Sequence, residues 1–382
     1  MKDRATEIRW LAMAVAAGLL FGWINSVVQA ADPEQTLRRD WCALQAAGSL
    51  LLQGRAAESY SLTFEGGYFF FHPPFVLYPC ALLGAISSTW LGYGVSIAIA
   101  VLSLAGALAL LRRMLPARPG VHATVAAVTV SSSPWFGVLA TGQVSAALVL
   151  VLAAGFLAWQ RGMPFRAGLL LALLAAKPNL GLPLFALAAL SGRWRLFAGI
   201  CAGTAVLLLS TLPLGTEVWL EWWAAMRRSG GTIAAHDVLL WRQPTLFAFW
   251  QTVLPARLAW IAWAAVSVVL YACLARIWGR RASGLDLPRV LSVTVLFLVS
   301  CNPHVFFYDG LLLLIPGAVW YACGDRYGGA GVHRTCGVLL ALVYAAQHVS
   351  TLLLQEQSPP LVGPLVTAWL VVEVWDLGRE PA

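Results

Sequence analysis

Residues 75–111 read FVLYPCALLGAISSTWLGYGVSIAIAVLSLAGALALL, and no position in this stretch carries a charged side chain. A single helix of this length would measure about 55 Å at 1.5 Å per residue, whereas the hydrocarbon core of a bilayer is about 30 Å thick. Residues 87–93, which include two serines and a glycine, interrupt the apolar pattern. The stretch therefore predicts two membrane crossings, or one crossing preceded by a short membrane-embedded segment.

Charge beyond this stretch distinguishes the two alternatives. Arg112, Arg113 and Arg118 follow it directly, and the positive-inside rule places such a cluster in the cytoplasm. Because the chain before residue 75 is predicted to lie outside, one net crossing is preferred.

The composition of the whole chain is typical of a membrane protein. Of the 382 residues, 60% are hydrophobic and 11% are charged, and the mean hydropathy is +0.76, which excludes a water-soluble globular domain. Backbone groups in lipid must bond within their own segment, so the apolar runs are predicted to be helices. The seven cysteines show neither metal-ligand nor paired spacing, so no disulfide is assigned.

The net charge of +8 would suggest a nucleic-acid partner for a soluble protein. In a chain this apolar, the arginines instead indicate which loops face the cytoplasm. We therefore expect the lipid bilayer, and no nucleic acid, as a partner.

The apolar runs predict an all-α polytopic fold of about twelve transmembrane helices with both termini in the cytoplasm. The first helix, about residues 8–31, resembles a signal peptide but exceeds the usual apolar core of about 7 to 15 residues, so we expect it to remain uncleaved. Residues 165–190 contain two runs that are too short to span singly, and they predict a hairpin with Lys177 and Pro178 at its tip. Beyond residue 111 the apolar runs cover residues 121–140, 144–160, 165–176, 180–190, 196–212, 258–277, 288–301, 306–322, 336–354 and 361–374.

We expect a single domain over residues 1–382. An N-terminal module, 1–213, contains a first outer loop at 32–74, and a second outer loop at 214–244 leads to the C-terminal helices at 245–382. Within the first loop, the apolar residues from Trp41 to Leu52 recur at helical spacing and predict a helix that lies on the membrane surface.

The predicted orientation gathers the polar interruptions on the outer face, whereas the inner loops carry little but arginine. These interruptions are Gly142 with Gln143, residues 177–179, residues 215–244 and residues 302–304. Asp40 lies on the same predicted face, so the candidate functional residues are expected to share one side of the membrane.

Asp40 stands near the start of the polar segment that runs from Arg38 to Pro74. A carboxylate just outside a membrane helix is suited to act as a general base, taking the proton of a sugar hydroxyl as that hydroxyl attacks a phosphate-activated sugar. The alternative is a solvated carboxylate that pairs with Arg38 or Arg39.

Lys177 is the second candidate, because this arginine-rich chain contains only one other lysine, Lys2. A cation between two apolar half-helices is costly unless it meets an anion, which favours a contact with a substrate phosphate. Alternatively, the side chain reaches along the protein to the outer interface.

Four further candidates flank the same polar interruptions. His72 and His304 each adjoin a proline at the predicted outer surface, where either could bind substrate or serve the structure. Asp309 follows Tyr308 and lies among apolar residues, so its carboxylate must face the protein interior or a cavity. We therefore expect these four residues to contribute to substrate binding.

Polar donors complete the candidate set. Arg242 and Gln243 precede Pro244, and they either donate to a phosphate or sugar or simply end the second outer loop. Gln143 either binds substrate or satisfies backbone groups in its turn. The sequence has no glycine-rich phosphate loop, zinc-ligand spacing or Asp-x-Asp motif, so neither a metal nor a cofactor is implied.

Several of these motifs occur in a characteristic order: Asp40 after the first helix, an aromatic turn with Pro73-Pro74, Ser133-Pro134, Gly142-Gln143, Ala176-Lys177-Pro178, and Asn302-Pro303 followed by Tyr308-Asp309. This ordered set, which extends over nearly the whole chain, resembles glycosyltransferase family 87, once grouped as DUF2029. His72 departs from the pattern, since a tyrosine commonly precedes the two prolines.

The resemblance implies a GT-C membrane fold and an inverting, metal-independent transferase. The expected donor is a polyprenyl-phosphate hexose, with mannose as the sugar, and the expected acceptor is a glycan or glycolipid hydroxyl at the outer face of the cytoplasmic membrane. Asp40 occupies the position of the family's catalytic base, and Lys177 that of its Lys-Pro motif. Lys177, together with Arg242, is then expected to neutralise the departing phosphate.

Two other functions remain open from the sequence. A transporter or flippase of lipid-linked sugars needs charged groups along both halves of its path, whereas the predicted spans offer few beyond Asp309, Lys177 and Glu373. The other alternative is a non-catalytic subunit of an envelope-assembly complex.

Overall fold

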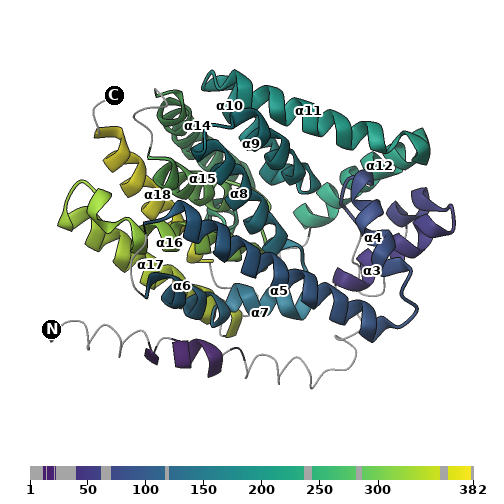
Figure 1. The fold of residues 1–382 in the computed structure, drawn as a ribbon, viewed down its shortest axis with the longest axis horizontal. Helices are drawn as coiled ribbons and strands as arrows, with labels where there is room; N and C mark the ends of the chain where they lie inside the picture. The colour runs from purple at the N-terminus through teal and green to yellow at the C-terminus, as the bar shows by residue number, and fades with distance from the viewer. Residues whose placement is uncertain are drawn as a thin grey trace.

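The computed structural model describes residues 12–13, 15–20, 22, 40–61, 70–116, 120–235, 243–280, 286–352 and 360–379. Within these residues the chain is helical and contains no strand, which confirms the predicted all-α class (Figure 1). Most of the predicted first helix lies outside the described residues, as do Arg38, Arg39 and Arg242.

The N-terminal half of the chain forms short helices around the first predicted loop and then a series of longer ones. Their bounds are α3 Asp40–Leu52, η1 Ala56–Tyr60, η2 Pro74–Val76, α4 Leu77–Gly84, α5 Thr89–Met114, α6 Val121–Val130, α7 Ser133–Thr141, α8 Ser145–Gln160, α9 Pro164–Leu171, η3 Ala172–Ala176, α10 Pro178–Leu190 and α11 Trp194–Ser210.

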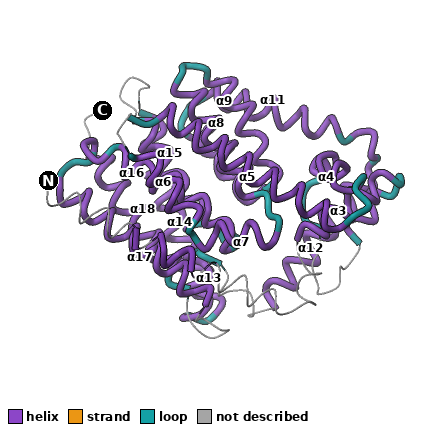
Figure 2. The backbone as a smooth tube through the Cα atoms, turned by 60° about the horizontal axis from the view of Figure 1, so that its bottom comes forward, coloured by secondary structure: helices purple, strands orange, loops and turns teal. Residues whose placement is uncertain are grey.

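The C-terminal half continues the helical pattern. Its elements are η4 Leu212–Leu214, α12 Thr216–Ala235, α13 Leu246–Val253, α14 Ala256–Gly279, α15 Leu287–Ser300, η7 Phe307–Leu313, α16 Leu314–Ala322, η8 Gly324–Arg326, α17 Ala330–Leu352 and α18 Val362–Arg379. Figure 2 shows that α14, α15, α16, α17 and α18 gather on one side of the molecule, whereas α12 lies near α3 and α4.

The break predicted within residues 75–111 is present. The short helix α4 ends at Gly84, and the 26-residue helix α5 begins at Thr89. The Oγ of Ser88 accepts a hydrogen bond from the backbone N–H of Leu91 at 3.3 Å, which caps the new helix. One long helix preceded by a short apolar one agrees with a single crossing rather than two.

One run that was expected to be a single helix is divided, and two others change their helix type along their length. Residues 121–140 form α6 and α7, which are bent by 56°, because Ser132 caps a second helix that has Pro134 in its first turn. In residues 165–176, α9 tightens into the 3₁₀ helix η3, and in residues 306–322 the 3₁₀ helix η7 precedes α16. A single helix was therefore the wrong prediction for residues 121–140, whereas residues 164–176 and 307–322 each form one continuous helical segment.

Three helical segments among the described residues are long and apolar enough to cross a bilayer, and the bent pair α6–α7 would make a fourth. Several other apolar helices, including α8, α10 and α15, contain only 10 to 17 residues. The structure therefore supports a membrane protein, and the count of about twelve spans stays a prediction.

The helix α8 lies within the bundle, and most of its residues are buried. Val149, Leu152 and Phe156 are fully buried, and α8 packs against α5, α9, α15 and η7 (Figure 1). Large apolar side chains on peripheral helices, such as Leu102 and Val206, are exposed instead. An outer surface of this kind suits a lipid environment.

The helix α3, which was predicted within the first loop, packs closely against α4. A Cβ added at Gly48 would lie 1.9 Å from the carbonyl oxygen of Cys80, and one added at Gly84 would lie 2.2 Å from the carbonyl carbon of Gly48. The two glycines therefore allow the backbones to touch. The position of α3 on the membrane surface stays a prediction, but its packing fixes where Asp40 lies.

A second apolar cluster holds the first loop in place. It joins α3, η1 and α4 to α12, which lies in the predicted second outer loop. The indole N–H of Trp222 donates to the carbonyl of Phe71 at 3.0 Å, and the hydroxyl of Tyr60 donates to the carbonyl of His72 at 3.0 Å. These contacts place the His72 turn against the helix bundle.

Candidate active site

Three connections meet at one end of the helix bundle, which we call the polar end. They are the α7–α8 turn at residues 142–144, Lys177 between η3 and α10, and residues 301–306 between α15 and η7. Hydrogen bonds and an ion pair join the three connections, as described below. The sequence predicted that these polar interruptions share one face, and the structure brings them together.

An ion pair between Lys177 and Asp309 forms the centre of the polar end. The Nζ of Lys177 lies 2.6 Å from Oδ1 and 2.5 Å from Oδ2 of Asp309. Asp309 is fully buried, whereas 14% of the Lys177 side chain is exposed. Asp309 therefore faces the interior, as predicted, and it supplies the anion that a lysine between apolar helices requires.

Other donors complete the surroundings of the Asp309 carboxylate. The Oγ of Ser145 donates to Oδ1 at 2.7 Å, and the backbone N–H of Phe306 donates to Oδ2 at 3.1 Å. The Lys177 ammonium also lies 5.3 Å from the ring centroid of Tyr308, a cation–π contact. Asp309 and Tyr308 thus hold the lysine in place.

The local sequence explains why Lys177 occupies this corner. Lys177 has a non-helical backbone conformation at the end of η3, and Pro178 starts α10 at the position where a missing N–H costs nothing. The lysine consequently lies at a boundary between two helices rather than within a continuous span. This position is the one expected for the tip of the predicted hairpin.

Asp40 begins α3, where the helix dipole favours a negative charge. Its Oδ2 accepts a hydrogen bond from the Nε2 of Gln143 in the α7–α8 turn. Gln143 therefore orients the candidate base, whereas the sequence had left open whether it only satisfied backbone groups.

Gly142 makes this contact possible. Its φ is +71°, a left-handed conformation that glycine adopts without strain. A Cβ at this position would also lie 2.5 Å from the Cβ of Trp41, the residue after Asp40. A glycine is thus needed both for the turn and for the close approach of α3.

Asp40 and Lys177 are both linked by hydrogen bonds to residues 143–145, where the α7–α8 turn leads into α8. Gln143 contacts Asp40, and Ser145, two residues later, contacts the carboxylate that pairs with Lys177. Three hydrogen-bonded contacts and the two-residue step from Gln143 to Ser145 therefore connect an acid and an ammonium that are far apart in the sequence.

His72 joins this group through its ring. Its Nδ1 lies 3.1 Å from the carbonyl oxygen of Ala176, and because a carbonyl can only accept, Nδ1 carries the proton and Nε2 keeps its lone pair. Burial lowers the pKa of His72, and the charge of Lys177 lowers it further. The ring is therefore a neutral acceptor beside Lys177.

His304 is also neutral. Burial, with a smaller contribution from the Lys177 charge, lowers its pKa to about 4. The side chain of Asn179 donates to the His304 carbonyl, and the His304 N–H donates to Oδ1 of Asn302 at 2.9 Å. The backbone of this segment is thus fixed while the imidazole lies beside Phe306.

Gln243 is not linked to this group. The residue is 2% exposed and lies before α13, which Thr245 caps. Its Oε1 has no hydrogen-bond partner, and within the described part of the chain no hydrogen bond joins it to Asp40 or Lys177. Arg242 lies outside the described residues, so its predicted role has no structural counterpart here.

Three polar residues that the sequence analysis did not single out as site residues belong to the site: Asn179 and Asn302, which lie within predicted polar interruptions, and Ser145. The Nδ2 of Asn302 donates to the carbonyl of Asn179 at 2.8 Å, so these two residues tie α10 to the end of α15. Each of the three lies at or next to the end of an apolar helix. A polar residue at such a position is the sequence signal that would have identified them as site residues.

These features define a class of protein: a helical membrane protein whose charged groups gather where short apolar helices begin and end. A scan against family models matches glycosyltransferase family 87 over residues 70–301. The match covers more than half of the chain, and the protein belongs to this family. His72, Gln143 and Lys177 lie inside the matched segment, whereas Asp40 and Asp309 lie outside it. A comparison with curated proteins gives no match.

Proposed function

We propose that this glycosyltransferase moves a hexose, with mannose as the expected sugar, from a polyprenyl-phosphate donor to a hydroxyl of a glycan or glycolipid. The family supports sugar transfer, and the apolar outer surface supports a membrane-bound donor. In this proposal the GT-C fold places the polar end at the outer face of the cytoplasmic membrane.

Asp40 is the base in the proposed reaction. It accepts the proton of the acceptor hydroxyl while the hydroxyl oxygen forms a bond to the anomeric carbon of the donor sugar. The bond from that carbon to the phosphate oxygen breaks, and the phosphate leaves with the electron pair. Attack from the opposite side inverts the configuration, and Gln143 orients the carboxylate.

Lys177 neutralises the charge that develops on the leaving phosphate. An ammonium has three N–H donors, and Asp309 offers it only two oxygens, so one donor is left for a ligand on the exposed side. His72, a neutral acceptor, is positioned to accept a hydrogen bond from a sugar hydroxyl, and neutral His304 is positioned to bind a sugar hydroxyl or a phosphate oxygen. No cofactor takes part in this scheme.

One observation supports this proposal above the others: Asp40 contacts Gln143 in the α7–α8 turn, and the Lys177–Asp309 pair contacts Ser145, two residues further on. A base and a phosphate-binding cation must lie within one substrate's reach of each other, and the contacts of Gln143 and Ser145 give that proximity.

The test compares Asp40→Asn with Glu58→Gln. Glu58 lies in the same loop and pairs with exposed Arg55, so its variant is a matched control for loss of a carboxylate. Purified protein is incubated with radiolabelled polyprenyl-phosphate-mannose and lipid acceptors. We expect Asp40→Asn to lower transfer by a factor of about 10² to 10⁴ with donor binding retained, and Glu58→Gln to leave the rate unchanged.

Two outcomes contradict the proposal. Full activity of Asp40→Asn rejects Asp40 as the base. Movement of the intact donor across vesicles by the wild-type protein, without release of polyprenyl phosphate, indicates the transporter that the sequence left open.

A further inference from the structure

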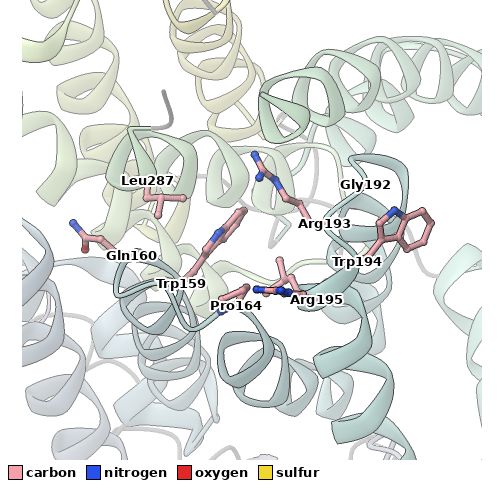
Figure 3. Close-up of a pocket in the computed structure, with 10 residues that line it drawn as sticks. Trp159, Gln160, Pro164, Gly192, Arg193, Trp194, Arg195 and Leu287 are labelled. Atoms are coloured by element: carbon pink, nitrogen blue, oxygen red, sulfur yellow. The ribbon is translucent and has the colours of Figure 1, made fainter. Parts of the chain in front are cut away.

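A pocket of about 490 Å³ lies at the opposite end of the helices that form the polar end. The helices α8 and α10 begin at the polar end and finish here, and α15 runs the other way. Its lining includes Trp159, Pro164, Arg193, Trp194, Arg195 and Leu287, as Figure 3 shows. This pocket is therefore separate from the proposed active site and does not depend on it.

Three helices begin in the wall of the pocket, namely α9 at Pro164, α11 at Trp194 and α15 at Leu287. None of them has a side-chain cap or an acidic residue in its first turn. Asp286 precedes α15, but its carboxylate accepts a hydrogen bond from Arg326 at 3.0 Å. Helix N-termini of this kind attract anions.

Two arginines add full positive charges. The Nε of Arg193 donates to the carbonyl of Trp278 at 2.7 Å, a second nitrogen donates to the carbonyl of Arg280, and the guanidinium lies 5.7 Å from the ring centroid of Trp159. Arg193 is therefore held in position by carbonyl groups, and no ion pair with a carboxylate occurs among the residues that the structure describes.

Arg195 differs from Arg193, since no hydrogen bond or ion pair of its side chain occurs within the described parts of the chain. In Figure 3 the guanidinium of Arg195 lies beside Pro164, whereas the ring of Trp194 points to the other side. Among the described residues no carboxylate lines the pocket, so a phosphate beside the Arg195 guanidinium would meet no negatively charged side chain in its walls, and the charge of Arg193 would add to the attraction.

The surroundings of the pocket favour a lipid over a soluble anion. Leu190, Phe165 and Trp194 lie next to or within the pocket wall and are 68%, 45% and 65% exposed. Such a surface stays in contact with acyl chains, and tryptophan commonly lies at the level of lipid headgroups. Basic pockets between membrane helices bind anionic headgroups.

We propose that this pocket binds the phosphate headgroup of an anionic phospholipid, with the acyl chains along the exposed side chains of α9, α10 and α11. On the predicted orientation the pocket faces the cytoplasmic leaflet, whose anionic lipids carry the matching charge. The site would then anchor the end of the bundle that lies away from the proposed chemistry.

The test measures lipid binding to the full-length protein by native mass spectrometry. Phosphatidylglycerol and phosphatidylcholine with identical acyl chains are compared on the wild type, on Arg195→Gln and on Arg161→Gln. Arg161 is the matched control, because it is an exposed arginine in the nearby α8–α9 turn that does not line the pocket. Arg193 is left intact because its bonds to two carbonyls support the fold.

We expect the wild type to prefer phosphatidylglycerol and Arg195→Gln to weaken its binding about tenfold, which corresponds to about 1.4 kcal/mol, while Arg161→Gln changes it less than twofold. Excess inorganic phosphate should not displace the lipid. Equal binding of both lipids by the wild type, equal losses in the two variants, or displacement by phosphate would each overturn the proposal.

Discussion

At the scale of single residues, the Lys177–Asp309 pair has two roles: it stabilises the fold, and in the proposed reaction it binds the donor phosphate. Asp309 is fully buried, and removing only its cation would leave an uncompensated charge inside the protein. A loss of activity in a Lys177 variant would therefore not by itself identify a phosphate contact. The two roles separate only when both charges are removed together.

We predict that Lys177→Met lowers the free energy of unfolding by about 3 to 5 kcal/mol, because it leaves Asp309 buried without its partner. The double variant Lys177→Met with Asp309→Asn should recover most of this stability but still fail to bind the polyprenyl-phosphate donor. Thermal unfolding and donor binding are measured on both variants. Recovery of donor binding in the double variant would restrict Lys177 to a structural role.

The two histidines predict a dependence of stability on pH. Burial lowers the pKa of His72, and it lowers the pKa of His304 from 6.5 to about 4. Between pH 6.5 and pH 4, His304 binds a proton more readily in the unfolded chain than in the folded chain. The free energy of unfolding therefore falls as the pH drops below about 6.5. The loss from His304 amounts to about 3 kcal/mol by pH 4.

Thermal unfolding between pH 7.5 and pH 5 measures this effect, and His304→Gln serves as the comparison. The variant lacks the titrating ring, so its unfolding temperature should fall less on acidification than that of the wild type. Parallel curves would show that His304 is not the group responsible.

At the scale of elements, turns rather than helix interiors determine the geometry of the site. The α7–α8 turn contacts α3 on one side and η7 on the other. Prolines and capping residues in the sequence marked many of these boundaries, such as Pro178 at α10 and Ser88 at α5. The 3₁₀ segments η3 and η7 could not be predicted, because apolar periodicity does not distinguish them from α-helix over so few residues.

Gly142→Ala tests the importance of this turn. The added methyl group would be strained at φ +71° and would collide with Trp41, so we expect a loss of stability and a transfer rate reduced at least about tenfold through the displaced Asp40. Gly120→Ala is the matched control, since Gly120 has φ +82° but open space around it. The control should lose only about 1 to 2 kcal/mol of stability and keep its activity.

Comparable losses of transfer activity in Gly142→Ala and Gly120→Ala would mean that the contact between the turn and Trp41 does not position the base. A normal rate in Gly142→Ala would have the same meaning.

At the scale of the whole molecule, the sequence predicted the helical class, the membrane character and the family, because composition and ordered motifs carry them. It also predicted that Gln143, Lys177 and His304 share one side, since the ends of successive helices alternate between two faces. It could not predict that Asp309 is the partner of Lys177 or that Ser145 joins them. Such pairings depend on how each helix is rotated, which one-dimensional patterns do not specify.

The shortness of α8, α10 and α15 has a consequence for the substrate. With 16, 13 and 14 residues, they measure only about 20 to 24 Å at 1.5 Å per residue, several ångströms less than a bilayer core of about 30 Å. If Arg193 and Arg195 lie at the cytoplasmic surface of the bilayer, Lys177, at the other end of these helices, lies below the outer surface. A lipid-borne sugar could then reach the ammonium by lateral diffusion, without lifting its phosphate into the water.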